Sequence, residues 1–496
     1  MYSLPTDDFR QYINGELVSG RGRTTQIRCP GNGEPVAQIA LATKEQAQQA
    51  LEAARDAFPG WSALTLEERG AWMMKLRDAI QRESENLLNL LMLESGKLRS
   101  HAAFETGSLT GYLSFFLEQA KSEHTQGIRD AAGGKNMFLA VREPVGVVVA
   151  ALAWNFPMHN LATKLGPILA SGCTAVIKPA TKTPLSTLYF GEILHRIGFP
   201  KGVINFVAGD AREIGTTLCE SPIPAMITMI GSTAGGLRMV RDSTTSVKRF
   251  SMELGGNAPV IVTPSADLSA AAAHVIGNKM RCAGQTCVAP QRAFVHRSVY
   301  REFLAMCTEI ASGAQCGTLD EQANTGPLID EAAVARMEQL VEDAVEKGAR
   351  VACGGTRPAD KTSGFYFLPT ILTGVMPEMR VFREEVFGPV LALMSYDTEE
   401  EAIRMANDTE YGLSSYIWST DLSQVYRLTR GLQFGIVNVN GPGTGPAVPH
   451  GGCKNSGIGK DGSRYSLEEY TYIKGCLLYT SPSPRDTERS RMPSSA

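Results

Sequence analysis

Two short stretches carry a carboxylate and a thiol that together could do covalent chemistry on a carbonyl group. Glu253 stands in Met-Glu-Leu-Gly-Gly-Asn after a strand-like run, and Cys287 stands in Gly-Gln-Thr-Cys thirty-four positions later. A thiolate can attack a carbonyl carbon, and a carboxylate can serve a later step as general base. Because both groups must reach one substrate atom, we expect the fold to bring these stretches together.

The thiol needs help to react at neutral pH. A free thiol has a pKa near 8.5, so only a few per cent of it is thiolate. A turn that leads into a helix would offer backbone N–H groups to the sulfur of Cys287. Taken alone, a cysteine is more simply interpreted as buried and inert, and we keep that interpretation for Cys282.

A third polar group follows an apolar run in Ala153-Trp-Asn-Phe-Pro157. The side-chain amide of Asn155 could stabilise the oxyanion that forms when a thiolate attacks a carbonyl group, together with the backbone N–H of Cys287. An asparagine just before Phe-Pro is otherwise an ordinary turn residue.

Two further segments are suited to a phosphorylated cofactor. Lys178 ends an apolar run, and Gly231-Ser-Thr-Ala-Gly-Gly236 follows the run 225–230 and precedes a helical stretch. A helix N-terminus binds pyrophosphate through its free N–H groups. Taken singly, these features also describe a solvated lysine and a flexible turn, and the glycine spacing is not the ordinary dinucleotide fingerprint.

The composition is that of an ordinary globular protein. The chain has 496 residues, 43% apolar and 20% charged, with a formal net charge of −3, so charge gives no reason to expect nucleic acid or an anionic membrane as partner. No apolar run reaches membrane-spanning length, and the N-terminus lacks a signal-like pattern. Ten cysteines without Cys-x-x-Cys and seven unclustered histidines favour free thiols in the cytoplasm and no metal site.

The elements that must position these groups alternate along the chain. Helical patterns cover 43–58, 64–90 and 102–120, and from Val145 onward apolar strand-like runs alternate with helices. Strands that are apolar on both faces, separated by helices, predict buried parallel sheets. A second such series, from Arg292 to about Asn440, predicts a second α/β lobe, and the crevice between two lobes is a usual ligand site.

Taken together, these stretches resemble the aldehyde dehydrogenase superfamily over roughly residues 10–475. The nearest members are the NAD(P)-dependent, non-acylating succinate-semialdehyde and aminoaldehyde dehydrogenases. The resemblance implies that Cys287 forms a thiohemiacetal and then a thioester, that Asn155 stabilises the oxyanion, and that Glu253 activates the water that releases the acid. It also implies two Rossmann-like parallel-sheet lobes and a small β bridging element used in a homodimer or homotetramer.

The resemblance also divides the chain. We expect residues 1–121 and 142–254 to form the cofactor-binding domain, residues 255–447 the catalytic domain, and residues 122–141 and 448–475 the bridging element.

The last residues depart from the family pattern. From Cys476 the sequence becomes Leu-Leu-Tyr-Thr-Ser-Pro-Ser-Pro and then rich in Ser, Arg and Pro, a composition typical of disorder. We expect residues 476–496 to be a disordered or non-native tail; a natural disordered tail is the alternative.

The resemblance assigns the cofactor to a set of eight residues: Trp154, Lys178, Thr181, Gly231, Ser232, Gly236, Glu385 and Phe387. NAD-preferring members usually have an acidic residue where this chain has Thr181, and Lys182 adds charge beside it. Because a carboxylate would repel a 2′-phosphate, we expect NADP more than NAD. Lys182 is equally well interpreted as a solvated surface residue.

The substrate positions implied by the resemblance are Asn160, Thr163, Arg281, Thr286 and Val288, which predict a polar pocket. Arg281 corresponds to an arginine that binds the distal carboxylate in succinate-semialdehyde dehydrogenases, and an unpaired guanidinium in a narrow channel favours an anionic substrate. This chain departs from the succinate-semialdehyde dehydrogenases at Thr163, where those enzymes have a second arginine. An internal salt bridge of Arg281 is the alternative.

The preferred substrate is therefore a small semialdehyde such as succinate semialdehyde. The stretch from Pro449 to Asp461 instead resembles aminoaldehyde-oxidising members, so an aminoaldehyde or an aliphatic aldehyde is the alternative. A coenzyme-A-acylating enzyme, a thiol hydrolase without nicotinamide and a non-catalytic binding protein on the same fold are less favoured, because all of the catalytic and cofactor motifs are present.

Overall fold

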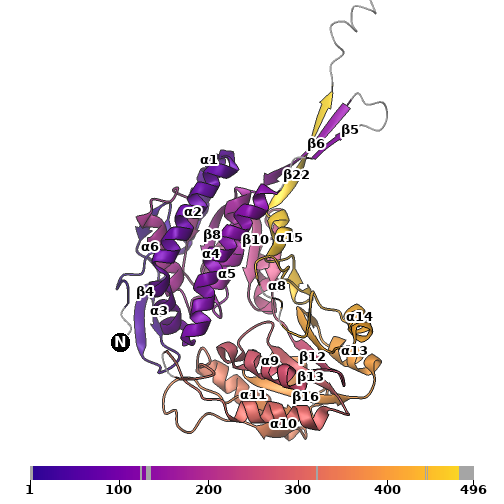
Figure 1. Cartoon of the computed structure of the whole chain (residues 1–496). Coiled ribbons are helices and arrows are strands. Elements are labelled where there is room, and N and C mark those ends of the chain that lie inside the picture. Colours follow the sequence, from indigo (N-terminus) through magenta and orange to yellow (C-terminus); the bar gives the residue numbers. More distant parts are fainter. Residues whose placement is uncertain are drawn as a thin grey trace, which may run out of the picture.

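The protein has two large α/β lobes, as its computed structural model shows (Figure 1). The structure describes residues 4–122, 126–129, 136–319, 322–441, 443 and 445–479. The two parallel-sheet lobes confirm the fold class that the alternating pattern predicts.

The first lobe is built on an eight-stranded sheet in the order β2-β1-β9-β8-β7-β10-β11-β21. Its central strands run parallel, and an antiparallel pairing closes each edge. The strand bounds are Gln11–Ile13 (β1), Glu16–Val18 (β2), Val147–Ala151 (β7), Thr174–Lys178 (β8), Ile204–Phe206 (β9), Pro224–Ile230 (β10), Arg249–Glu253 (β11) and Gly457–Ile458 (β21).

The second lobe is built on a seven-stranded sheet in the order β14-β15-β16-β13-β12-β18-β19, in which only the edge strand β14 is antiparallel. The strand bounds are Ala258–Val262 (β12), Pro290–His296 (β13), Arg350–Cys353 (β14), Thr370–Thr373 (β15), Val390–Tyr396 (β16), Ser414–Trp418 (β18) and Ile436–Val439 (β19).

Helices cover both faces of each sheet. Successive residues of a strand point to opposite faces, and on β7 Val147 and Val149 join one buried cluster whereas Val148 and Ala150 join another. The helices of the first lobe are Lys44–Ala63 (α1), Leu66–Arg82 (α2), Ser84–Ser95 (α3), Arg99–Lys121 (α4), Pro157–Ser171 (α5), Leu185–Arg196 (α6), Glu213–Glu220 (α7), Thr233–Asp242 (α8) and Ser463–Glu469 (α15). Those of the second lobe are Leu268–Met280 (α9), Tyr300–Ser312 (α10), Glu331–Glu346 (α11), Arg380–Arg383 (α12), Glu399–Asn407 (α13) and Leu422–Gly431 (α14).

The single helix expected over 64–90 is in fact two helices. The chain turns at Glu83, whose φ and ψ are −98° and 8°, and the Glu83 carboxylate accepts hydrogen bonds from Tyr189 and Asn86. A tertiary contact with α6 therefore ends α2, which a local pattern does not reveal. A capping box formed by Thr43 and Gln46 begins α1.

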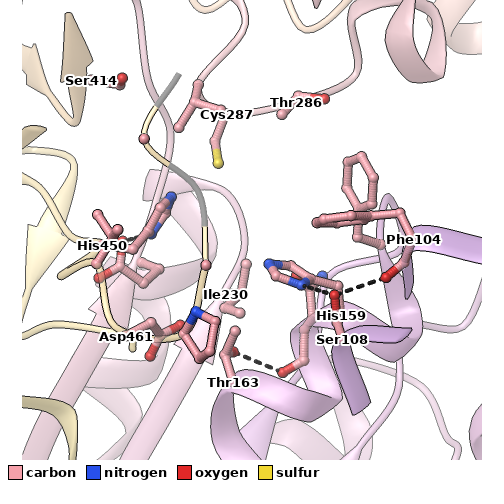
Figure 2. Close-up of a pocket in the computed structure, with 18 of the residues that line it drawn as sticks. Phe104, Ser108, His159, Thr163, Ile230, Thr286, Cys287, Ser414, His450 and Asp461 are labelled. Atoms are coloured by element: carbon pink, nitrogen blue, oxygen red, sulfur yellow. Dashed lines mark hydrogen bonds and ion pairs between the residues drawn. The ribbon is translucent and has the colours of Figure 1, made fainter. Parts of the chain in front are cut away.

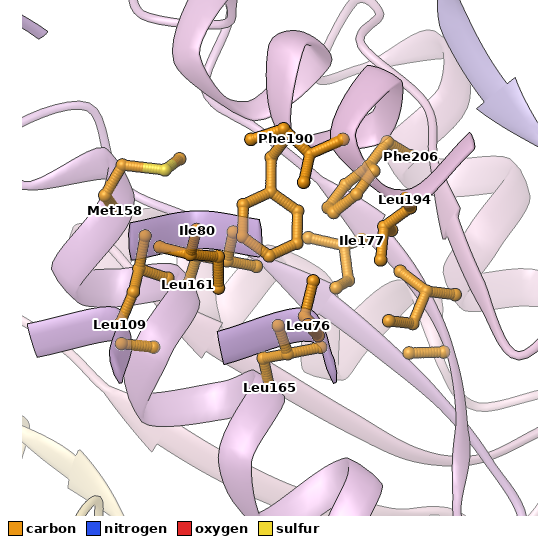
Figure 3. Close-up of a cluster of buried hydrophobic side chains, with 14 of the residues drawn as sticks. Leu76, Ile80, Leu109, Met158, Leu161, Leu165, Ile177, Phe190, Leu194 and Phe206 are labelled. Carbon is orange, nitrogen blue, oxygen red and sulfur yellow. The ribbon is translucent and has the colours of Figure 1, made fainter. Parts of the chain in front are cut away.

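The largest core lies between the first sheet and its helices (Figure 3). Fully buried apolar side chains from α2, α4, α5, α6, β8 and β9 fill it, among them Leu76, Ile80, Leu109, Met158, Leu161, Leu165, Ile177, Phe190, Leu194 and Phe206. Burying an aliphatic side chain stabilises a fold by about 1.5–3 kcal/mol. This packing holds α5 rigidly against the sheet, and α5 begins just after Asn155.

A three-stranded sheet projects away from the two lobes (Figure 1). It consists of β5 (Gln126–Arg129), β6 (Asn136–Pro144) and β22 (Thr471–Tyr479), in the order β22-β6-β5. Two short pairs complete the strands: β3 (Thr24–Arg28) with β4 (Pro35–Ala40), and β17 (Tyr411–Gly412) with β20 (Cys453–Lys454).

β22 continues past the expected start of the tail at Cys476, because it pairs with β6 without interruption as far as Tyr479. Apolar residues on both strands of this pairing, such as Leu477 opposite Phe138, favour the extension. Residues 480–496 lie outside the described residues. The expected domain boundaries stay a prediction, and the 448–475 segment contributes β21 to the first sheet as well as most of β22.

Within the described ranges, none of the helices is long and apolar enough to cross a membrane.

Candidate active site

A cavity of about 500 Å³ lies between the two lobes and is lined by Asn155, Glu253 and Cys287. Figure 2 shows the sulfur of Cys287 in this cavity. Asn155 and Glu253 come from the carboxyl ends of β7 and β11, and Cys287 precedes β13. Ligands bind outside the carboxyl ends of parallel strands in open α/β sheets. The structure thus brings together the three groups that the sequence assigns to catalysis; their chemical roles stay predictions.

The turn that carries Cys287 has an unusual backbone. Cys282 and Ala283 have φ values of 51° and 52°, in the left-handed region that costs a non-glycine residue about 1–2 kcal/mol. Gly284 continues this run, and a Cβ there would lie 2.2 Å from the carbonyl oxygen of Gly388. The buried side chain of Gln285 holds the turn by accepting from Ile329 N at 2.9 Å and donating to Cys282 O at 2.9 Å.

The two motifs meet at Gly256. A Cβ on this residue would lie 2.2 Å from the carbonyl oxygen of Cys287, so the backbone of the glutamate motif packs directly against the nucleophile turn. Only glycine permits this approach. This backbone contact therefore sets the distance between the Glu253 carboxylate and the Cys287 thiol.

A buried ion pair positions Asn155. Lys97 and Glu105 are both fully buried and paired with each other, and Lys97 Nζ also donates to Asn155 O at 2.8 Å. Glu105 accepts from the backbone N–H of Met158 at 2.9 Å at the start of α5. The pair thus fixes the turn that precedes α5.

The side-chain amide of Asn155 keeps donor capacity for the cavity. Its Nδ2 donates to Gln285 O at 3.0 Å, and its Oδ1 accepts from Phe156 N at 3.1 Å. An amide nitrogen has two hydrogens, so the second hydrogen is available to an oxyanion.

Glu253 is the last residue of β11, and its side chain is 3% exposed. Its closest charged contact is His450, with Nδ1 3.4 Å from Glu253 Oε2. Burial raises the pKa of Glu253 above its ordinary value, and the contact with His450 opposes that shift. A buried carboxylate with a raised pKa is suited to general-base work near neutral pH.

The substrate wall differs from the expected polar pocket. Asn160, Thr163 and Thr286 do line the cavity, but Phe104 and Phe156 line it too. Thr163 donates its hydroxyl to Asn160 O at 3.0 Å, within α5. The aromatic ring of Phe104 comes from α4, far away in the sequence, which explains why the motif positions did not reveal it.

Arg281 lies on this wall without a carboxylate partner among the described residues. Its guanidinium stacks on Phe104 at 4.4 Å and on Phe156 at 5.3 Å from the ring centroids. The described part of the chain therefore shows no internal salt bridge of Arg281, which was the alternative. Burial lowers the pKa of Arg281, and the planar group keeps its N–H edges for an anion because its faces are stacked.

Two cavity histidines were not selected from the sequence. His159 on α5 and His450 both point into the cavity (Figure 2). Burial lowers the pKa of His159 to about 3, so its ring is neutral, and Nδ1 lies 3.0 Å from Ser108 Oγ. His450 stands in the Pro-His-Gly-Gly motif that served only as a substrate hint, and its nearness to Cys287 depends on the fold.

The cofactor residues form a second group beside the cavity. Ser232 caps α8 by accepting from Gly235 N at 3.2 Å, and a Cβ on Gly236 would lie 2.7 Å from Leu254. Gly231 N donates to Glu253 O at 3.0 Å, so the start of α8 is joined to the strand that carries Glu253. The capped N-terminus of this ten-residue helix suits a pyrophosphate.

Lys178, Trp154, Phe387 and Glu385 complete that group. Lys178 is 8% exposed. Within the described ranges its ammonium makes one hydrogen bond, a 3.4 Å contact with Pro179 O, so it has N–H donors left for a ligand. The rings of Trp154 and Phe387 meet edge to face at 5.4 Å. Glu385 accepts from Gly256 N at 2.9 Å, and burial raises its pKa to about 7. These residues fit a nicotinamide dinucleotide.

Thr181 and Lys182, which we expect to select the 2′-phosphate of NADP, differ in how free their side chains are to bind it. Thr181 donates to Gly209 O at 3.2 Å and carries no charge. Lys182 pairs with Asp330 at 2.6 Å and lies over the ring of Trp154. Its charge is therefore partly neutralised.

Comparison with known proteins gives concordant matches. The sequence pattern of the aldehyde dehydrogenase family matches residues 17–476. The chain is 38% identical to succinate-semialdehyde dehydrogenase [NADP(+)] GabD of Escherichia coli strain K12, over 94% of this chain and 97% of that one. It is also 38% identical to glutarate-semialdehyde dehydrogenase of Pseudomonas putida strain KT2440, with the same shares covered. A crystal structure of an E. coli NADP-dependent enzyme superposes with a TM-score of 0.93 at 36% identity, covering 96% of this chain and 100% of that one.

Proposed function

The chain belongs to the aldehyde dehydrogenase family, and we propose that it oxidises small aldehydes bearing a distal carboxylate to the corresponding acids. It is an NAD(P)-dependent oxidoreductase. The observation that carries the substrate proposal is Arg281. Its guanidinium lines the same cavity as Cys287 and has no carboxylate partner among the described residues.

The first half of the reaction uses Cys287 and Asn155. The thiolate sulfur forms a bond to the aldehyde carbon, and the carbonyl oxygen becomes an oxyanion. The free N–H of the Asn155 amide and the backbone N–H of Cys287 stabilise that charge. A bound nicotinamide would supply the acceptor for the hydride that leaves this carbon, and loss of the hydride leaves a thioester on Cys287.

The second half uses Glu253. The carboxylate takes a proton from a water molecule, whose oxygen attacks the thioester carbon. The C–S bond breaks, the acid leaves and the thiolate returns. Because burial raises the pKa of Glu253, it is a stronger base than an exposed glutamate.

The finer cofactor proposal is a preference for NADP⁺ over NAD⁺. It is supported by the uncharged Thr181 near Lys178 and by the NADP(+) in the names of similar proteins. The pairing of Lys182 with Asp330 limits this preference, so we expect both cofactors to be used.

We propose that the protein assembles as a homodimer or homotetramer through its projecting three-stranded sheet. This sheet exposes apolar side chains, with Ile473 64% and Leu477 44% exposed.

We propose that the protein is located in the cytoplasm, because all ten of its cysteines are free thiols.

The substrate proposal is tested by steady-state formation of NAD(P)H. Wild-type protein, Arg281→Leu and Arg281→Lys are compared on succinate semialdehyde, 4-aminobutyraldehyde and butanal with each cofactor. Hydrogen bonds to a charged group are worth about 1.5–3 kcal/mol, or roughly 10- to 150-fold. We expect Arg281→Leu to lose about that factor in kcat/KM for the semialdehyde alone, and Arg281→Lys to lose less.

Butanal serves as the neutral control of the same carbon number. An equal loss on butanal would make Arg281 structural, and faster wild-type turnover of the aminoaldehyde would replace the semialdehyde proposal with the alternative substrate class.

A further inference from the structure

His450 lies between the thiol and the carboxylate of the reaction centre. Its Nδ1 is 3.4 Å from Glu253 Oε2. The ring also lines the same cavity as Cys287 and interacts electrostatically with its side chain. Figure 2 shows the imidazole of His450 and the sulfur of Cys287 facing the same cavity. Because an imidazolium carries an N–H on each ring nitrogen, one ring can serve both partners.

The surroundings favour the charged ring. Burial works against an imidazolium, but the contacts with Cys287 and Glu253 outweigh it and raise the pKa of His450 well above its ordinary value. The His450 side chain is 36% exposed and that of Glu253 is 3% exposed, so the ring also connects the buried carboxylate with the open cavity.

The other charged or imidazole groups near this ring are Asp461, Lys460, His159 and Arg281, and Lys460 Nζ donates to Gly451 O at 2.8 Å. Asp461 is paired with Lys164 at 2.6 Å, and both are buried. His159, whose buried ring is neutral, and Arg281 line the same cavity from α5 and the nucleophile turn. Since Asp461 is paired with Lys164, the potential anions left for the ring are Cys287 and Glu253.

The backbone of His450 is held rigidly. His450 N donates to Asp461 O at 2.8 Å, and Asp461 N donates to His450 O at 2.6 Å. The pair of Asp461 with Lys164 then ties this bridge to α5. A Cβ on Gly451 would lie 2.8 Å from Glu253 Oε1, so the residue after His450 also packs on the carboxylate.

We propose that His450 is a positioning residue that holds a proton between Cys287 and Glu253, so that the resting enzyme keeps an imidazolium beside a thiolate. This deepens the proposed function and rests on Cys287 as its nucleophile. The proton leaves the thiol and is carried by the ring, and no electron is transferred. When the sulfur bonds to the aldehyde carbon, the imidazolium remains beside Glu253 and favours the ionised base.

The experiment measures alkylation of Cys287 by iodoacetamide as a function of pH, in full-length protein without aldehyde or cofactor. Peptide mass spectrometry separates Cys287 from the exposed Cys453, which serves as an internal reference thiol. His450→Gln keeps a hydrogen-bonding group without charge, and His450→Phe keeps a flat ring. We expect both variants to slow alkylation of Cys287 about tenfold at pH 7 and to move its pH midpoint up by about one unit.

His296→Gln is the matched control, because His296 lies at the far end of β13 and bonds Ser298; its profile should equal that of the wild type. Thermal unfolding of each variant separates misfolding from a change at the site. An unchanged midpoint in folded His450→Gln and His450→Phe would overturn the proposal. Alkylation requires no turnover, so a wrong substrate class leaves this result unaffected.

Discussion

At the residue scale, the reaction centre depends on side chains that come from different strand ends. Asn155 follows β7, Glu253 ends β11 and Cys287 precedes β13 of the other lobe. The proposed mechanism requires the reacting atom of the aldehyde to lie near all three, and their side chains converge in the cavity between the lobes. The same crevice places Lys178, at the end of β8, on the cofactor side.

Lys178 should make cofactor affinity depend on pH. Burial lowers its pKa to about 8, so the ammonium loses its charge as pH rises through that value. We expect the Kd for NADP⁺ to be smallest at low pH and to increase between about pH 7 and 9.5. Bound phosphate stabilises the charged form, so the midpoint in the complex should lie above that of the free enzyme.

Quenching of tryptophan fluorescence measures this affinity, with Lys178→Met as the comparison. That variant should bind NADP⁺ weakly and with no step in this range. A wild-type Kd that stays flat across the range would show that Lys178 does not contact the cofactor.

Residues within a motif were predictable, and residues brought in by the fold were not. Cys287 and Glu253 have informative neighbours in the sequence, such as the glycines of their own turns. Phe104 has no such neighbours, and the Pro-His-Gly-Gly motif of His450 gave only a substrate hint. Their places in the cavity arise from the packing of α4 and from the bridge to Asp461.

At the element scale, α4 and α5 are joined by the buried pair of Lys97 and Glu105. The pair contacts Asn155 O and the first N–H groups of α5. A carboxylate near a helix N-terminus is favourable, but a buried charge without a partner is costly. The pair therefore links the stability of the first lobe to the position of Asn155.

We expect Lys97→Met to lower the free energy of unfolding by about 3–5 kcal/mol, because it leaves Glu105 buried and unpaired. Denaturant unfolding at neutral pH measures this change. Lys121→Met removes an exposed pair with Glu118 on the same helix and should cost less than about 1 kcal/mol. Equal effects of the two changes would contradict a special role for the buried pair.

Local patterns predicted most elements of the two sheets but not where every helix ends. The runs that became β7, β8 and β10 are apolar along their length, and their burial in the structure explains that signal. The division between α2 and α3 depends on Glu83 bonding Tyr189, a contact over a hundred residues away in sequence.

At the scale of the whole molecule, the three-stranded sheet is the part that the lobes do not cover (Figure 1). β22 pairs with β6 from Thr471 to Tyr479, and exposed apolar residues line the pairing. Composition alone placed the end of order at 475, because the Ser- and Pro-rich stretch begins close to Cys476. Pairing with β6 is a long-range effect that composition does not report.

Two truncated chains should distinguish the role of strand β22, which pairs with β6 up to Tyr479, from that of residues 480–496. If the full-length protein forms the proposed oligomer, we expect a chain ending at Tyr479 to have the same assembly state in light scattering. A chain ending at Lys474 keeps only the pairings of 471–474 with 141–144 and should shift toward smaller species. The same mass for both truncations would show that residues 475–479 do not support assembly.

The central claim is that Cys287 carries the acyl intermediate and Glu253 releases it. The most direct test is to mix the Glu253→Gln variant with NADP⁺ and succinate semialdehyde and to measure intact and peptide masses. The account predicts one burst of NADPH per site and a succinyl mass increase on the peptide that contains Cys287. A burst without that adduct, or an adduct on another cysteine such as Cys282, would contradict it.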